Sequence, residues 1–352
     1  MIGSLFHRWE RRLASVDADR VVRPFSWGLD WIPGGERWAG ARPNEVLADF
    51  AADALADSDS FFDAPPTSDY RWLDAQGEAG DLTRTLSVPS AIVTPHPENN
   101  TVYARHFPAR MSTRRAMGAS GRRAVLVLPQ WNADAGGHVG LCRILANVGL
   151  TALRLSLPYH DRRMPPSLQR ADYIVSSNVG RTLQVCRQAV VDARRAIAWL
   201  AGQGYDRIGI LGTSLGSCLS MLTTAHEPLI RAEALNHVSQ FFADPVWEGL
   251  STAHVRAGFE GHITLDELRR CWMPISPQAY VERVRDRRTL LLYARYDLTF
   301  PVHLSLNLVN EFRRRGIPHE LAVLPCGHYT SGVTPFKYLD AYHLTSFLLR
   351  NL

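Results

Sequence analysis

The sequence predicts an α/β protein in which helices flank a mostly parallel sheet. From about residue 121 onward, short apolar runs alternate with longer segments of helical period. The expected strands, rich in leucine and β-branched residues, are residues 123–128, 151–157, 207–211, 232–238, 289–294 and 320–324. The expected helices are residues 139–148, 179–202, 215–225, 303–315 and 335–352. Strands separated by helices indicate right-handed crossovers and therefore a parallel sheet.

Two further strands are expected at the edge of this sheet. Residues 83–94 and 101–108 have strand character and are joined by a turn that contains Pro95 and Pro97. Residues 1–82 are interpreted as an N-terminal extension with a helix at 44–55, and residues 83–352 as the main domain.

A helical insertion is predicted at residues 241–286, where a single connection would otherwise join two strands. Thr264 and Glu267 form a capping-box pattern, which is typical of a helix start. Because the segment is longer than a connection needs, we expect it to act as a cap over a pocket; the alternative is a long loop with two helices.

The composition is that of a globular protein, with 46% hydrophobic and 21% charged residues. The net charge is +5, but the basic residues are arginines scattered among acidic ones, and Lys337 is the single lysine. Charges mixed in this way are typical of solvated helix faces, so no nucleic-acid partner is expected. The oligomeric state is not predicted.

The cysteines and the N-terminus favour a cytoplasmic protein. The five cysteines form no metal-binding or disulfide spacing, and no apolar run reaches the length of a membrane span. Apolar residues of the first segment, among them Leu5 and Trp9, recur at helical spacing between arginines. We interpret this helix as packed on its own domain, with attachment to a membrane surface as the alternative.

A candidate nucleophile, Ser214, lies in the pattern Gly-Thr-Ser-Leu-Gly at 212–216. A predicted strand leads directly into the pattern and a predicted helix follows it. The G-x-S-x-G arrangement between strand and helix exposes the serine hydroxyl on a tight turn. The start of the helix supplies free N–H groups beside it. The alternative is a tight turn with an incidental serine.

A serine nucleophile requires a base and an acid that orients the base. In this topology both follow the serine, each after a later strand, in the order acid and then histidine. Asp297 and His328 meet that requirement. Asp244 is the rival for the acid, and His138, His160, His237 and His303 also lie near strand ends or turns.

Together these three motifs resemble the α/β-hydrolase superfamily, over roughly residues 83–352. The resemblance implies a Ser214–His328–Asp297 triad and an oxyanion hole to which Leu215 donates its backbone N–H. The usual His-Gly pair of the second oxyanion loop is missing, because the corresponding segment reads Leu-Pro-Gln-Trp-Asn at 128–132. By position the second donor is Trp131, with Gln130 as the alternative.

Substrate-binding residues are expected at the carboxyl ends of the strands, where such sheets build their sites. Gln130, Tyr159 and His160 follow two of these strands. Adjacent residues such as His160 and Asp161 rarely share one metal ion, so no metal site is predicted. No cofactor is predicted either, since no phosphate-binding loop is present.

The expected activity is that of a cofactor-independent carboxylesterase acting on small-molecule esters. A thioesterase or lipid hydrolase would carry the same residues, and a catalytically silent ligand-binding protein is the alternative from another class. The natural substrate is not predicted.

Overall fold

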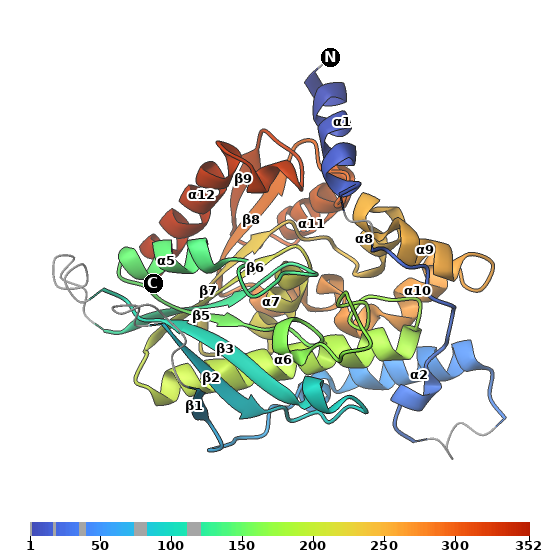
Figure 1. The fold of residues 1–352 in the computed structure, drawn as a ribbon. Helices are drawn as coiled ribbons and strands as arrows, with labels where there is room; N and C mark the ends of the chain where they lie inside the picture. The colour runs from blue at the N-terminus through green and yellow to red at the C-terminus, as the bar shows by residue number, and fades with distance from the viewer. Residues whose placement is uncertain (1, 17–18, 35–39, 74–82, 111–120) are drawn as a thin grey trace.

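A nine-stranded sheet runs through the computed structural model, which describes residues 2–16, 19–34, 40–73, 83–110 and 121–352 (Figure 1). The strand order is β1-β2-β3-β5-β4-β6-β7-β8-β9. The parallel strands are β4 (Arg123–Leu128), β5 (Thr151–Leu155), β6 (Arg207–Thr213), β7 (Ile230–Asn236), β8 (Arg288–Ala294) and β9 (Glu320–Leu324). The predicted fold class, a mostly parallel sheet with flanking helices, is confirmed.

Three antiparallel strands extend one edge of the sheet: β1 (Arg71–Leu73), β2 (Arg84–Pro89) and β3 (Thr101–Phe107). Strand β2 ends earlier than the sequence suggested. After Pro89 the chain turns through η3 (Pro97–Asn100), and the side chain of Asn100 accepts the N–H of Thr94, which closes the turn.

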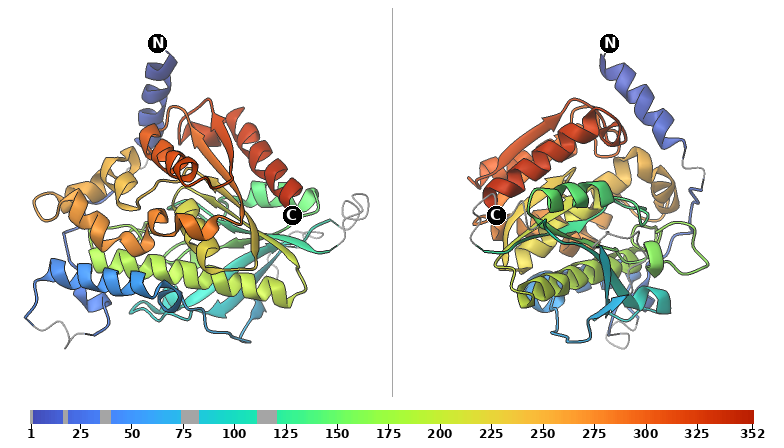
Figure 2. Two further views of the ribbon diagram at one scale, coloured as in Figure 1. Left: turned by 180° about the vertical axis from the view of Figure 1, so that it is seen from behind. Right: turned by 60° about the vertical axis from the view of Figure 1, so that its left-hand side comes forward.

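Helices cover both faces of the sheet (Figure 2). On one face lie α5 (Val139–Asn147) and α12 (Phe336–Asn351), packed on Val125 and Val127. On the other lie α6 (Val179–Gly202), α7 (Leu215–His226) and α11 (Val302–Arg314). Alternate residues of each central strand therefore serve different layers, which explains why these strands read as continuous apolar runs.

The connection between β7 and β8 is helical. It consists of α8 (Ala243–Glu248), η5 (Leu250–Thr252), α9 (Ala253–Phe259), α10 (Leu265–Cys271), η6 (Met273–Ile275) and η7 (Pro277–Val284). Helix α10 begins at the expected capping box, in which Thr264 and Glu267 satisfy each other's backbone N–H groups.

The N-terminal residues contribute α1 (Ile2–Ala14), η1 (Leu29–Trp31), α2 (Pro43–Ala56) and α3 (Ser58–Phe61). Helix α2 contacts α10 and η6, whereas α1 rises from the rest of the molecule and contacts η5 and η8 (Thr330–Gly332) (Figures 1 and 2). The predicted boundary at residue 82 lies outside the described residues. Among the described helices, none combines the length and apolarity needed to cross a bilayer.

A buried ion pair ties three segments together below the carboxyl ends of the strands. Arg163, in η4 (Asp161–Arg163), lies 2.8 Å from the Asp192 carboxylate on α6, and both side chains are fully buried. Arg163 also donates to the carbonyl oxygens of Asn99 and Ser156, and Ser90 donates to Asp192. Breaking such a pair leaves an uncompensated charge in the interior.

We expect Arg163→Met to lower the free energy of unfolding by about 3–5 kcal/mol, because Asp192 then remains buried without its counter-ion. Urea denaturation measures the loss. The double variant Arg163→Met/Asp192→Leu should recover part of it. A double variant as unstable as the sum of the two single variants would contradict a coupled pair.

Candidate active site

Ser214 occupies a strained turn between β6 and α7. Its backbone has φ 57° and ψ −119°, in a region that non-glycine residues rarely adopt. The turn is held by β7, because the N–H of Ser214 donates to the carbonyl oxygen of Asn236 at 2.7 Å. Ser217 donates to the same oxygen at 2.6 Å. The geometry is that of the nucleophile turn expected from the motif.

The two glycines of the motif are required by close backbone approaches. A Cβ atom on Gly212 would lie 2.2 Å from the carbonyl oxygen of Gly216, and one on Gly216 would lie 2.2 Å from that of Leu128. The second approach brings the loop after β4 directly against the start of α7. Small residues at these positions therefore set the distance between the serine and the candidate oxyanion loop.

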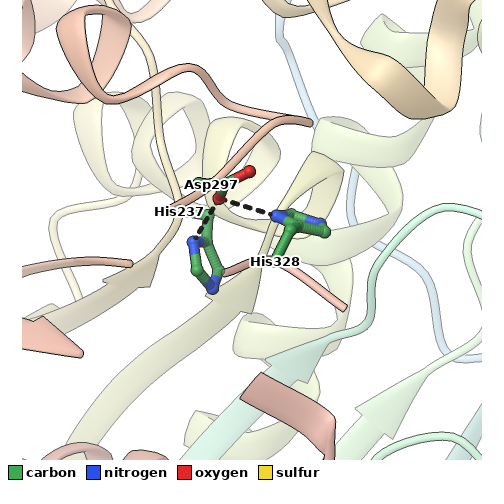
Figure 3. A group of neighbouring side chains, drawn as sticks. All are labelled: His237, Asp297 and His328. Carbon is green, nitrogen blue, oxygen red and sulfur yellow. Dashed lines mark hydrogen bonds and ion pairs between the residues drawn. The ribbon is translucent and has the colours of Figure 1, made fainter. Parts of the chain in front are cut away.

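His328 and Asp297 meet at the tips of β9 and β8 (Figure 3). The Nδ1 atom of His328 lies 3.0 Å from Oδ2 of Asp297. The other carboxylate oxygen accepts the backbone N–H groups of Thr299 and Phe300, both at 2.7 Å. With Nδ1 facing the carboxylate, Nε2 is the ring nitrogen left for proton transfer, and His328 and Ser214 line the same cavity.

The rival acid, Asp244, has a different partner. Its carboxylate accepts a hydrogen bond from Arg269 at 2.7 Å, within the insertion. The pairing of His328 with Asp297 therefore matches the arrangement that the sequence favoured.

The electrostatics keep the acid ionised and the histidine basic. Burial opposes the charged form of Asp297, but the adjacent His328 and His237 hold the pKa of this carboxyl below its ordinary range. Burial would also lower the pKa of His328, yet the Asp297 carboxylate outweighs it and raises the pKa. Since a general base acts only when neutral, activity should fall as the pH drops through this raised pKa.

A second histidine shares the acid. His237 follows β7, and its Nδ1 lies 3.0 Å from the same Oδ2 of Asp297; the two imidazole rings are 4.6 Å apart (Figure 3). The sequence showed only that His237 lies near a strand end or turn, as do His138, His160 and His303. Its pairing with a residue 60 positions later depends on the β7–β8 register, in which Asn236 lies opposite Leu292.

A cavity of 1010 Å³ opens beside these groups, lined by Ser214, His237 and His328. Gln130 and Trp131 line it as well. The indole N–H of Trp131 donates to the carbonyl oxygen of Ala171, which holds the ring in place; its backbone N–H remains the candidate oxyanion donor expected from the sequence. Leu215, the other predicted donor, is the first residue of α7, where a backbone N–H has no partner within the helix.

The expected substrate role of Tyr159 is not what the structure shows. Its side chain is fully buried in the core, and its hydroxyl lies 3.0 Å from a ring nitrogen of His96. The residue has φ 64°, in the left-handed region, and Tyr159 is not among the residues that line the cavity.

His160 does line the cavity, but both of its ring nitrogens are already used. Nε2 accepts the backbone N–H of Asn132 at 2.9 Å, and Nδ1 lies 2.9 Å from the carbonyl oxygen of Pro158. Burial lowers the pKa of His160 to about 4, which favours the neutral tautomer that these contacts require. The residue thus fixes the loop that carries Gln130 and Trp131 instead of binding substrate through its ring.

Comparison with solved structures identifies the fold. Acetyl xylan esterase from Paenibacillus sp. R4 superposes with a TM-score of 0.60 at 14% identity, covering 94% of this chain and 100% of the esterase. Acetyl xylan esterase 1 from Thermoanaerobacterium sp. JW/SL YS485 gives 0.59 at 13% identity, covering 96% and 98%. The chain has the α/β-hydrolase fold.

A third similar structure is the acylaminoacyl peptidase of Pyrococcus horikoshii, with a TM-score of 0.56 at 14% identity. This superposition covers 72% of the chain but only 40% of the peptidase. The chain therefore spans less than half the length of that enzyme. No protein-family model and no curated protein sequence matches the chain.

We expect Asp297→Asn to lower kcat by about 10⁴-fold, because an amide would favour the wrong histidine tautomer while leaving the geometry intact. Steady-state kinetics on a 4-nitrophenyl ester measure the change. Asp244→Asn is the matched control and should retain most of the activity. The opposite ranking of the two variants would show that Asp244 is the acid.

Proposed function

We propose that this chain is a serine hydrolase that cleaves carboxylic esters through an acyl-enzyme intermediate. The observation that carries the proposal is that Ser214, on a strained turn, and His328, paired with a buried Asp297, line one cavity. A surface or structural serine has no need of a strained backbone or of a histidine–carboxylate pair beside it.

The geometry supports the following sequence of steps. Ser214 Oγ attacks the ester carbonyl carbon while His328 Nε2 takes the hydroxyl proton. The backbone N–H groups of Leu215 and Trp131 stabilise the oxyanion, and Gln130 is the alternative second donor. The histidinium then protonates the leaving alcohol. Water, deprotonated by the same ring, releases the carboxylic acid and restores the serine.

Esters are favoured over peptides as substrates. The superposition with the acylaminoacyl peptidase covers 40% of that enzyme. The two acetyl xylan esterases, in contrast, are covered almost completely. Amide hydrolysis would use the same residues, and it is therefore an outcome that the kinetic test must include.

We also propose the cytoplasm as its compartment. All five cysteines are buried free thiols, and burial raises the pKa of each of them. Such thiols resist oxidation and act as small apolar side chains.

We expect a fluorophosphonate probe to label the wild type covalently, and Ser214→Ala to abolish the labelling. The same variant should lose at least about 10³-fold in ester hydrolysis, because the members of a triad act as a unit. Mass spectrometry of the labelled peptide locates the adduct. A folded wild-type protein that neither reacts with the probe nor cleaves esters would support the silent ligand-binding alternative.

A further inference from the structure

Ser214 lies between two cavities of different size and character. The larger, of 1010 Å³, is lined by Ser214 together with His328 and His237. The smaller, of 50 Å³, is lined by Ser214 and Leu215 but not by His328. An ester bound for attack at Ser214 must place its acyl group and its alcohol group on different sides of the reacting carbon.

The smaller cavity is mostly apolar. Its walls include Cys218 on α7, Phe242 and Val246 from the insertion, and Phe300 from the loop after Asp297, all of them buried. A dry protein cavity of about 150 Å³ accommodates benzene. A third of that volume is enough for a substituent of about one or two carbons.

The larger cavity carries buried polar groups that can bind a polar ligand. Gln130 Oε1, His138 Nδ1 and Asn236 Oδ1 are buried in its walls without a hydrogen-bond partner among the described residues. Asp340 lines it too and accepts from Asn236 at 3.1 Å; burial raises its pKa to about 7. Buried polar atoms of this kind favour a ligand that supplies the missing hydrogen bonds.

The position of His328 decides which half of the ester occupies which cavity. The histidine that deprotonates Ser214 must afterwards protonate the departing alcohol oxygen. The alcohol therefore departs on the side that His328 lines, which is the large polar cavity. The acyl group is left with the small apolar cavity, next to the Leu215 N–H that would stabilise the oxyanion.

We propose that the substrate is the ester of a short acyl group, of about acetyl size, with a large polyhydroxylated or otherwise polar alcohol. This inference rests on the proposed serine-hydrolase function. In the first step the Ser214 Oγ–acyl bond forms, the acyl–alkoxy bond breaks, and the serine proton passes through His328 to the alcohol. Water then releases the short carboxylic acid.

Two substrate series test the two halves of this proposal. With 4-nitrophenyl as the common alcohol, kcat/KM should fall at least about 10-fold from acetate to hexanoate, since extra methylenes do not fit the small cavity. With acetyl as the common acyl group, glycerol triacetate should be cleaved at least about 10-fold faster per ester than hexyl acetate.

Val246→Ala enlarges the small cavity and should raise the hexanoate-to-acetate ratio of kcat/KM by about 10-fold. Val191→Ala, a buried position on α6 that lines neither cavity, is the matched control and should leave the ratio unchanged.

If hexanoate or hexyl acetate is cleaved as fast as its short or polar counterpart while the fluorophosphonate labels Ser214, the substrate class is wrong and the hydrolase function stands. If Ser214 is not labelled and no ester is cleaved, both proposals fail.

A different set of contacts gives the N-terminal helix a role in the same site. Glu10 on α1 is completely buried, and its carboxylate accepts the backbone N–H groups of Tyr329 and Thr330 at 2.9 and 2.8 Å. The Thr330 hydroxyl donates to it as well, at 2.8 Å. A Cβ atom on Gly327 would lie 2.4 Å from the Glu10 side chain, so the glycine is needed for this approach. The contacts immediately flank His328.

The same helix also contacts the loop that carries the acid. The ring of Phe6 stacks on Tyr296, the residue before Asp297, with ring centres 4.7 Å apart. The N–H of Tyr296 donates to Cys326 at 2.9 Å, which links the acid loop to the histidine loop. Helix α1 therefore rests on both loops of the acid–base pair.

We infer that Glu10 is a positioning residue that holds the His328 loop in its catalytic geometry from the N-terminal helix. Its buried carboxylate fills the place where three donors of the loop would otherwise be unsatisfied. The charged and titratable groups that act on His328 are Asp297, His237 and Glu10. The Asp297 carboxylate is the main cause of the raised pKa of His328, and Glu10 adds to it.

We expect Glu10→Gln to lower kcat about 10-fold, because the His328 loop loses one hydrogen-bond acceptor. KM should change little, because the residues that line the substrate cavity are unchanged. The acid limb of the kcat/KM profile should also move to lower pH, since removal of a negative charge lowers the pKa of His328. The exposed Arg8→Gln on the same helix is the control and should change neither. If Glu10→Gln lowers the melting temperature but leaves kcat and the acid limb unchanged, Glu10 stabilises the fold and does not position His328 for catalysis.

Discussion

The arrangement of the site depends on the buried carboxylate of Asp297. One of its oxygens accepts two backbone N–H groups of its own loop, and the other faces Nδ1 atoms of both His328 and His237. These contacts join the tips of three parallel strands, β7, β8 and β9. The carboxylate remains charged although it is buried, so its partners must lie close to it. This requirement orients the two imidazole rings.

The serine is placed by backbone packing rather than by charge. Gly216 lets α7 approach the loop after β4, and the carbonyl oxygen of Asn236 fixes the Ser214 N–H from the neighbouring strand. His160 then holds the far end of that loop through Asn132. The candidate nucleophile, the candidate oxyanion loop and the candidate acid–base pair thus lie at the ends of different strands, as is usual for sites at the carboxyl edge of a parallel sheet.

Segments outside the parallel sheet complete the site. The insertion between β7 and β8 supplies Phe242 and Val246 to the small cavity, and α1 supplies Glu10 to the histidine loop. The walls of the larger cavity instead contain buried polar atoms that lack a hydrogen-bond partner among the described residues. The two cavities differ because α7 and the insertion supply apolar walls to the small one, whereas α5, α12 and the loops at the strand ends line the larger one. This difference is the basis for the proposed substrate class.

The sequence by itself determined the order of strands and helices from β4 onward, the turn at Ser214 and the candidate acid and histidine that follow it, because periodicity and short motifs are properties of neighbouring residues. Only the tertiary structure decided that His237 shares Asp297, that Tyr159 turns into the core, that both ring nitrogens of His160 are used, and that Glu10 reaches Thr330. Each of these depends on contacts between segments distant in the chain, up to 320 positions apart for Glu10 and Thr330. No local pattern encodes such pairings, since they are fixed by strand register, by the direction of single side chains and by how a terminal helix packs on the finished sheet.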